Sequence, residues 1–473
     1  MPLTSSTGAA EAVPVKTSLT LALILAFLVV LPYLPGMRRF GVGQPMRHLV
    51  TLGRVPSLNA DATVKPQPTR PPEPSRAKVA PSDWPDPVAP DCYGFKTSLR
   101  HFYEALGRTE APNSSNVTRV LHYGDSPVTA DLITADVRSL LQRRFGNAGH
   151  GFLLIAKPWA WYEHRGVSLK ASGWTIEAAT QQRARDGYHG LGGVSFRGDK
   201  GAKSRVTLSE TQTAVEIDYL EQPDGGTFEV SVGSQILGTV QTAGPGKKLE
   251  FARFSLPPET KEVALDVTSG SVRAFGFVFE RQGGGVIYSS LGLNGAQVQA
   301  VLRYFEPRQW AEAIRNQHPD LVIINYGTNE SVYPQYIEKQ YGGELRTVIE
   351  RVRQAVPEAS VLVMSPMDRG ERTNGGEIES PPVLSRIVEI QKQTARETGC
   401  AFYDTFDAMG GAGTMGRWFN QQPRLVSGDF MHPLPGGASK VGALVADALT
   451  HGYDRYLAGQ THITSARTPG VVK

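Results

Sequence analysis

Short apolar runs that alternate with helix-forming stretches constrain the fold of this chain most. Arg119–Tyr123, Leu321–Asn325 and Ser360–Met364 are nearly continuous apolar runs of strand length. After the first run, Val128–Phe145 carries apolar side chains at helical spacing. Strands that alternate with helices form a parallel sheet that is covered on both faces. We therefore predict an α/β fold built on a parallel sheet.

The C-terminal part of the sequence continues this alternation. We predict helices over Tyr336–Val356 and Pro382–Thr398, a short strand over Ala401–Asp404 and a last helix over Pro435–Tyr456. Ligands of such sheets bind at the carboxyl ends of the strands. Polar residues that directly follow a strand are therefore the first candidates for a functional site.

The sequence changes in character within residues 159–281. Short stretches there, such as Ala214–Tyr219, alternate apolar with polar residues, and turns such as Pro223–Gly226 separate them. This pattern is typical of antiparallel β structure. We predict an all-β insert at 159–281, a small sandwich or jelly roll, within a frame formed by residues 91–158 and 282–460.

The N-terminal part of the chain is predicted to lie outside this fold. Residues 17–37 carry no charge and are long enough to span a bilayer, which requires ~20 apolar residues. No cleavage site of small residues clearly follows, so we predict a retained signal anchor after a short tail at 1–16. Residues 38–90 contain ten prolines from Pro56 onward and form the predicted linker. Residues 461–473 are predicted to be a disordered tail.

An anchor, a stiff linker and a globular body together indicate a tethered exported protein. We expect a body outside the cytoplasm, in the periplasm or at the cell surface, held by a single N-terminal helix. The charges around the span indicate the opposite orientation, because Lys16 precedes it whereas Arg38, Arg39, Arg47 and Arg54 follow it. The sequence therefore leaves the membrane orientation open.

Composition excludes several classes of protein. Lys and Arg number 49 against 45 for Asp and Glu, and without a basic stripe or a known motif we expect no nucleic-acid partner. Two cysteines, Cys92 and Cys400, exclude a disulfide-rich scaffold and a cysteine-based zinc module. They are either two buried free thiols or one bridge. The oligomeric state cannot be inferred from the sequence.

Ser126 is the first candidate for catalysis. It follows the first predicted strand in Gly124-Asp125-Ser126 and opens a helix, where its own N–H and the helix N-terminus can stabilise negative charge. A serine hydroxyl needs a general base to act as a nucleophile. A helix-capping serine is the alternative explanation if no base is present.

His432 is the candidate base. The segment Asp429-Phe430-Met431-His432 places a carboxylate three residues before the imidazole. Asp429 can then accept from Nδ1–H and leave Nε2 free for Ser126. The remaining histidines are expected to be ordinary core or surface residues.

Two further residues can stabilise an oxyanion. Asn329 follows the strand Leu321–Asn325 in Gly327-Thr328-Asn329-Glu330 and offers a side-chain amide. Gly295 lies in a loop before a predicted helix, where its backbone N–H can closely approach a carbonyl group. Asn329 can alternatively be a simple turn residue.

These blocks together resemble the SGNH subgroup of the GDSL hydrolases. Gly124-Asp125-Ser126, Gly295, Gly327-Thr328-Asn329-Glu330 and Asp429-x-x-His432 occur in the order of the family blocks. Glu330 departs mildly from the family, which often has Asp at this position. The resemblance covers roughly residues 119–156 and 285–456.

The resemblance implies a flavodoxin-like three-layer α/β/α fold and a carboxylic ester hydrolase. It implies that Ser126 is the nucleophile, that His432 is the general base and then the general acid, and that Asp429 orients it. The Ser126 N–H, the Gly295 N–H and the Asn329 amide would form the oxyanion hole. No metal and no organic cofactor are implied.

Within this family, the β-rich insert makes the chain similar to bacterial peptidoglycan O-acetylesterases, whose insert resembles a carbohydrate module. The expected function is removal of O-acetyl, or other short acyl, groups from an extracytoplasmic glycan. The same triad would also serve a glycan O-acetyltransferase, and an inactive carbohydrate-binding envelope protein is a further alternative. Trp159, Trp161 and Trp174 are either platforms for sugar rings or packing residues of the insert. The acyl group and the polymer remain open.

Overall fold

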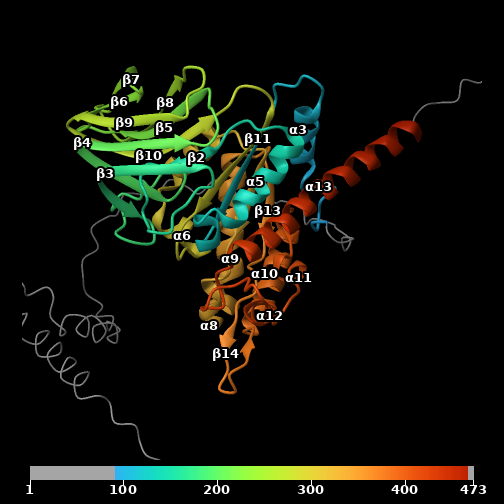
Figure 1. The fold of residues 1–473 in the computed structure, drawn as a ribbon. Coiled ribbons are helices and arrows are strands. Elements are labelled where there is room, and N and C mark those ends of the chain that lie inside the picture. Colours follow the sequence, from blue (N-terminus) through green and yellow to red (C-terminus); the bar gives the residue numbers. More distant parts are fainter. Residues whose placement is uncertain (1–90, 467–473) are drawn as a thin grey trace, which may run out of the picture. The chain divides into compact units, whose positions relative to one another are not determined.

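The structure, a computed structural model, describes residues 91–466. A five-stranded parallel sheet with the order β11-β1-β12-β13-β16 forms its frame (Figure 1). In the order of the chain this is 2-1-3-4-5, the order of flavodoxin-like sheets. The strands are β1 (Val117–Gly124), β11 (Gly285–Gly292), β12 (Leu321–Asn325), β13 (Ser360–Met364) and β16 (Ala401–Tyr403).

Helices cover both faces of this sheet. Along β12, Val322 and Ile324 pack into one apolar cluster, whereas Leu321 and Ile323 pack into the other. This alternation follows from the two-residue period of a strand, and it explains why β12 is apolar throughout. The first cluster includes side chains of α7 (Pro307–Asn316), α9 (Gly342–Ala355) and α10 (Val383–Glu397), and the second includes α3 (Arg100–Glu110), α5 (Leu132–Phe145), α12 (Thr414–Asn420) and α13 (Pro435–Ala466).

A second, antiparallel sheet of nine strands forms the insert. Its strands are paired in the order β7-β6-β9-β4-β10-β5-β8, with β2 added on β10 and β3 on β4. β2 comes before residue 159, so this sheet begins earlier in the chain than the predicted insert. The strands are β2 (Gly151–Leu154), β3 (Val167–Ala178), β4 (Val194–Leu208), β5 (Ala214–Glu221), β6 (Thr227–Val232), β7 (Gln235–Gln241), β8 (Lys248–Ser255), β9 (Glu262–Ser269) and β10 (Ser271–Glu280).

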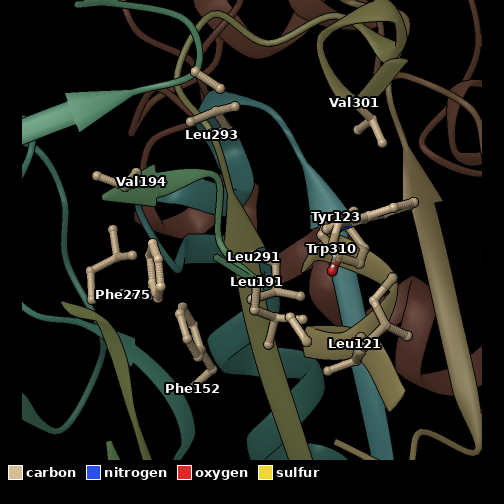
Figure 2. Close-up of a cluster of buried hydrophobic side chains, with 14 of the residues drawn as sticks. Leu121, Tyr123, Phe152, Leu191, Val194, Phe275, Leu291, Leu293, Val301 and Trp310 are labelled. Carbon is tan, nitrogen blue, oxygen red and sulfur yellow. Dashed lines mark hydrogen bonds between the residues drawn. The ribbon is translucent and has the colours of Figure 1, made fainter. Parts of the chain in front are cut away.

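The frame and the insert share one apolar core. Phe152 and Phe275 of the insert sheet belong to the same buried cluster as Leu121 of β1 and Leu291 of β11. Figure 2 shows the two phenylalanine rings beside one another and Leu191 next to Leu291. The insert is therefore packed against the parallel sheet itself and is not a module that hangs from a linker.

The helix predicted over Val128–Phe145 is interrupted. A short α4 (Ser126–Thr129) ends before Asp131, and α5 begins only at Leu132. Asp131 adopts a left-handed conformation with φ of 49°, and its buried carboxylate accepts hydrogen bonds from Arg138 and His164. Arg138 belongs to α5 itself, whereas His164 belongs to the insert, so part of what holds Asp131 is a tertiary contact.

The helix predicted over Tyr336–Val356 is also subdivided. A turn at α8 (Pro334–Tyr336) continues into a π-helical turn over Ile337–Tyr341, and α9 then completes the segment.

The last helix runs beyond its predicted end at Tyr456 to Ala466, because no proline interrupts it before Pro469. The remaining predicted strands and helices occur within a few residues of their predicted positions.

Several elements were not predicted, among them α3, α7, α12 and β11. The strand β11 contains Ser289 and Ser290 in its centre, which masks its apolar character in the sequence. Ser289 is buried and accepts a hydrogen bond from the Phe152 N–H at 3.1 Å. A partner in the insert thus allows a hydroxyl inside the sheet.

Cys92 and Cys400 are buried free thiols.

The predicted tail, membrane span and linker at 1–90 lie outside the described residues. Within the described residues, no helix combines the length and the apolar character that a bilayer span requires.

We predict that Phe152→Ala destabilises frame and insert together. Removal of this buried ring from the shared core should lower the free energy of unfolding by about 3–5 kcal/mol. Urea titration followed by circular dichroism and by tryptophan fluorescence measures the loss. Ile236→Ala, at an exposed position in β7, is the control and should change stability by less than about 0.5 kcal/mol. Separate transitions for the two signals would contradict a common core.

Candidate active site

The predicted site residues come together at the carboxyl edge of the parallel sheet. Ser126 follows β1, Gly295 follows β11 and Asn329 follows β12. Because β1 pairs with β11 on one side and with β12 on the other, the three segments are neighbours. The gap between β1 and β12 is the switch point of this strand order, where α/β sheets bind their ligands.

The turn that presents Ser126 depends on the glycine before it. A Cβ on Gly124 would lie 2.5 Å from Cγ2 of Val128 and 3.1 Å from the carbonyl oxygen of Asn325. A side chain at this position would therefore push α4 away from β12. With glycine, the chain turns at once and Ser126 becomes the first residue of α4.

Ser126, His432 and Asp429 form a hydrogen-bonded chain. Oγ of Ser126 is 2.8 Å from Nε2 of His432. Nδ1 of His432 is 2.6 Å from Oδ2 of Asp429. This arrangement matches that of a serine nucleophile, a base and an orienting carboxylate. The side chains of His432 and Asp429 are 43% and 51% exposed, so the base lies at an open edge of the site.

The loop that carries Asp429 is organised around its carboxylate. Oδ1 accepts hydrogen bonds from the backbone N–H groups of Met431 and His432, both at 3.0 Å, and from the Ser427 hydroxyl at 2.5 Å. Partial burial opposes ionisation, but these bonds together with the His432 imidazole outweigh it and hold the pKa of Asp429 well below its usual value. Asp429 is therefore ionised throughout the neutral range and can fix the tautomer of His432.

The two other predicted oxyanion donors lie close to each other. The side-chain amide of Asn329 donates to the carbonyl oxygen of Ala296, directly after Gly295, at 2.9 Å. A second, longer bond of 3.4 Å joins this amide to Oδ2 of Asp125. Gly295 has φ of 68°, and a Cβ there would meet no atom within 4 Å. The side of Gly295 on which a Cβ would lie is therefore open.

Glu330 is a buried carboxyl group that joins the two oxyanion segments. Oε1 accepts from the N–H of Val298 at 2.7 Å, and Oε2 accepts from the N–H of Gly327 at 3.0 Å. Val298 begins α6 (Val298–Tyr304) after the Gly295 loop, whereas Gly327 leads into Asn329. Burial raises the pKa of Glu330 to about 8, although both N–H donors favour its ionised form.

Asp125 is a second buried carboxyl group at the site. Burial raises its pKa to about 6, against the opposing effect of a hydrogen bond with Thr328. Its Oδ2 contacts the Asn329 amide, so it connects the Ser126 turn with the β12 loop.

The sequence pattern indicates no role for Asp125 or Ser427, and Glu330 stands out in it only as a departure from the family. The available signal was a carboxyl group inside each polar block that follows a strand. Asp125 and Glu330 link segments that become neighbours only through strand pairing, so this function could not be predicted from the sequence. Among the described residues, no group of three or more His, Cys, Asp or Glu side chains is placed to hold a metal ion.

Comparison with known proteins places the chain among the esterase folds. Residues 257–439 match the GDSL-like lipase/acylhydrolase family, a stretch that contains Gly295, Asn329 and His432 but not Ser126, which precedes the insert. No curated protein sequence matches the chain significantly.

Among solved structures, the chain is similar to one described as a peptidoglycan O-acetylesterase in action. The identity is 22%, the TM-score is 0.66, and the match covers 76% of this chain and 98% of the other. An extracellular lipase from Streptomyces rimosus matches with 19% identity and a TM-score of 0.27, over 34% of this chain and 80% of that one. A cellobiose complex of CsCBM6-3 from Clostridium stercorarium matches with 20% identity and a TM-score of 0.18, over 24% and 87%. The last two scores are too low to support an argument.

The strand order, the matched stretch and the first of these structures define the fold. The chain has the SGNH hydrolase fold with an inserted β domain, and it resembles the peptidoglycan O-acetylesterases of that fold. Residues 257–439 are in addition similar in sequence to the GDSL-like lipases and acylhydrolases.

We predict that Glu330 makes stability depend on pH. Its pKa is raised from 4.5 to about 8 on folding, so its favourable contribution is complete below pH 4.5 and is lost as the pH rises through about 8. Glu330→Gln cannot ionise. The free energy of unfolding of the wild type minus that of Glu330→Gln should therefore fall between pH 5 and pH 8.5.

Urea titrations at several pH values measure this difference. Glu358→Gln, at an exposed position, is the matched control and should follow the wild type at every pH. A difference that stays constant with pH would show that Glu330 ionises equally in the folded and unfolded states.

Proposed function

We propose that this protein is a serine esterase that removes O-acetyl groups from an extracytoplasmic glycan such as peptidoglycan. The observation that carries the proposal is the continuous hydrogen-bonded chain from Ser126 through His432 to Asp429 beside the Asn329 amide. A nucleophile, a base and oxyanion donors at one sheet edge are the groups that acyl transfer requires.

In the proposed first step, His432 Nε2 removes the proton of Ser126 as Oγ attacks the acetyl carbonyl carbon. The carbonyl oxygen becomes negative, and the N–H groups of Ser126 and Gly295 and the Asn329 amide stabilise it. The 3.4 Å bond between Asn329 and Asp125 is the weaker of the two that the amide makes, so it is the one that the oxyanion replaces. His432 then gives its proton to the sugar oxygen, and the sugar leaves as an alcohol.

The second step returns the enzyme to its starting state. Water enters at the exposed side of His432, loses a proton to Nε2 and attacks the acetyl carbon. Ser126 Oγ leaves and regains the proton, and acetate is released. Asp429, ionised at neutral pH, stabilises the imidazolium form of His432 in both steps.

The glycan substrate is supported by the similarity to a peptidoglycan O-acetylesterase structure and by the insert packed beside the site.

We also propose that the body acts outside the cytoplasm and is tethered by residues 17–37. The uncharged length of that segment supports the tether, and the arginines that follow it oppose the orientation. Protease accessibility of the body in intact cells and in spheroplasts tests this proposal. Protection in both would place the body in the cytoplasm.

We predict that Asn329→Ala lowers kcat by about 10²–10³-fold, because one of three oxyanion donors is lost. Its KM should change little, since the amide acts mainly on the charge that develops in the transition state. Initial rates of acetate release measure both constants. Asn420→Ala, at an exposed position in α12, is the control and should behave as the wild type.

The function itself is tested by acetate release from O-acetylated peptidoglycan and from an acetylated polysaccharide, with Ser126→Ala as the inactive control. We expect release by the wild type and none above background by the variant. A sugar acceptor added in parallel detects transfer, and transfer that exceeds release would identify a transferase instead. No release from any ester would overturn the proposed function.

A further inference from the structure

Exposed apolar side chains gather around the proposed catalytic residues. Six large apolar side chains among the described residues are exposed, and four of them belong to segments at the site. Val332 and Tyr333 follow Asn329 closely, Leu434 follows His432, and Trp161 is hydrogen-bonded to the residue before Gly295. Folding gains nothing from apolar surface left in water, so such a group marks a binding surface.

Trp161 is the largest of these side chains and the one that the insert contributes. It is 51% exposed, and its Nε1–H donates to Oδ1 of Asn294 at 3.3 Å. The carbonyl oxygen of Asn294 also accepts from the Thr180 hydroxyl at 2.9 Å. Two residues of the insert therefore hold the loop that carries Gly295, and one of them exposes an indole ring there.

The turn around Trp161 is fixed on both sides. Trp159 is 6% exposed and donates to Gln181, and Tyr162 is 8% exposed and accepts from the Leu154 N–H. Trp159 is thus a packing residue of the insert, whereas Trp161 lies between two anchors and packs into no core cluster. A ring held in this way loses little conformational freedom when a ligand stacks on it.

We propose that Trp161 forms a sugar-binding subsite at the rim of the active site, on which one pyranose ring of the acetylated glycan stacks. This inference rests on the proposed function and deepens it. The face of an indole ring carries partial negative charge and attracts the polarised C–H groups on the apolar face of a pyranose. The neighbouring Asn294 amide and the ion pair of Lys157 with Glu163 at 2.8 Å offer polar partners for hydroxyl groups.

The order of the strands indicates a polymer rather than a single sugar. Trp161 contacts the loop after β11, whereas a groove of about 630 Å³ lies at the loops after β12 and β13 and is lined by Ser331, Val332 and Arg369. Since β1 lies between β11 and β12, Ser126 lies between these two surfaces. A glycan strand that follows the sheet edge can therefore place one sugar on Trp161 and later sugars in the groove.

The test compares a polymeric with a small substrate. For Trp161→Ala we expect kcat/KM on O-acetylated peptidoglycan to fall about tenfold, mainly through KM, as expected for loss of one aromatic contact. Hydrolysis of 4-nitrophenyl acetate should fall much less, and by the same factor in Trp161→Ala and Trp161→Phe, because both lose the hydrogen bond to Asn294 and this ester does not reach the subsite. Trp161→Phe should retain most of the glycan activity.

Trp174→Ala is the matched control, since Trp174 is a half-buried tryptophan of the insert whose Nε1–H also donates to a neighbour, the Lys203 carbonyl oxygen. It should leave both activities unchanged. Equal losses on both substrates in Trp161→Ala would show that the indole only supports the Gly295 loop, and no loss on either would show that it binds nothing. Either result overturns the inference.

A binding experiment separates this inference from the proposed function. Soluble peptidoglycan fragments are titrated into Ser126→Ala and into the double variant Ser126→Ala/Trp161→Ala, with affinity measured by calorimetry. Weaker binding by the double variant supports the subsite even if the wild type releases no acetate. Equal binding by the two proteins overturns the subsite even if the wild type is an active esterase.

Discussion

The pairing of β1 with β11 on one side and β12 on the other determines where Ser126, Gly295 and Asn329 lie. All three strands run in parallel, so the segments after them meet at one edge. The carboxyl group of Glu330 then fixes the distance between two of these segments by accepting an N–H from each. The oxyanion donors are therefore positioned by the parallel sheet. His432 lies in a separate loop, which is held by hydrogen bonds to the Asp429 carboxylate.

The insert takes part in the site because it takes part in the core. Phe152 and Phe275 pack into the cluster that includes β1, and this packing brings the turn of Trp161 against Asn294. The buried pair of Arg138 and Asp131 has a third member, His164, from the insert. A domain that was joined only by flexible linkers could not hold a side chain against a catalytic loop with such contacts.

Strand-length apolar runs were sufficient to predict four of the five strands of the parallel sheet, but not β11, which leads into the Gly295 loop. The prediction failed where distant contacts decide the local structure. Asp131 interrupts a helix because Arg138 and His164 hold its carboxylate, and Ser289 occupies a strand because Phe152 satisfies its hydroxyl. Trp159 is buried and Trp161 is exposed because they lie on opposite faces of one turn, of which only one face packs against the insert. A turn has no periodic pattern of apolar residues, so this difference could not be predicted from the sequence.

The carboxyl groups of the site differ in the direction in which the protein shifts their pKa values. Behind the oxyanion position, burial raises the pKa of Asp125 to about 6 and of Glu330 to about 8, which limits the negative charge near a developing oxyanion. At the open edge, Asp429 stays ionised because hydrogen bonds outweigh its partial burial, and its charge stabilises the imidazolium of His432. Glu330 thus stays protonated at neutral pH behind the oxyanion position, whereas His432 and Asp429 lie at an edge that is exposed to solvent. Trp161 and the β12 loop also expose apolar side chains, and such exposed side chains beside an exposed base suit a polymeric substrate that approaches from solvent.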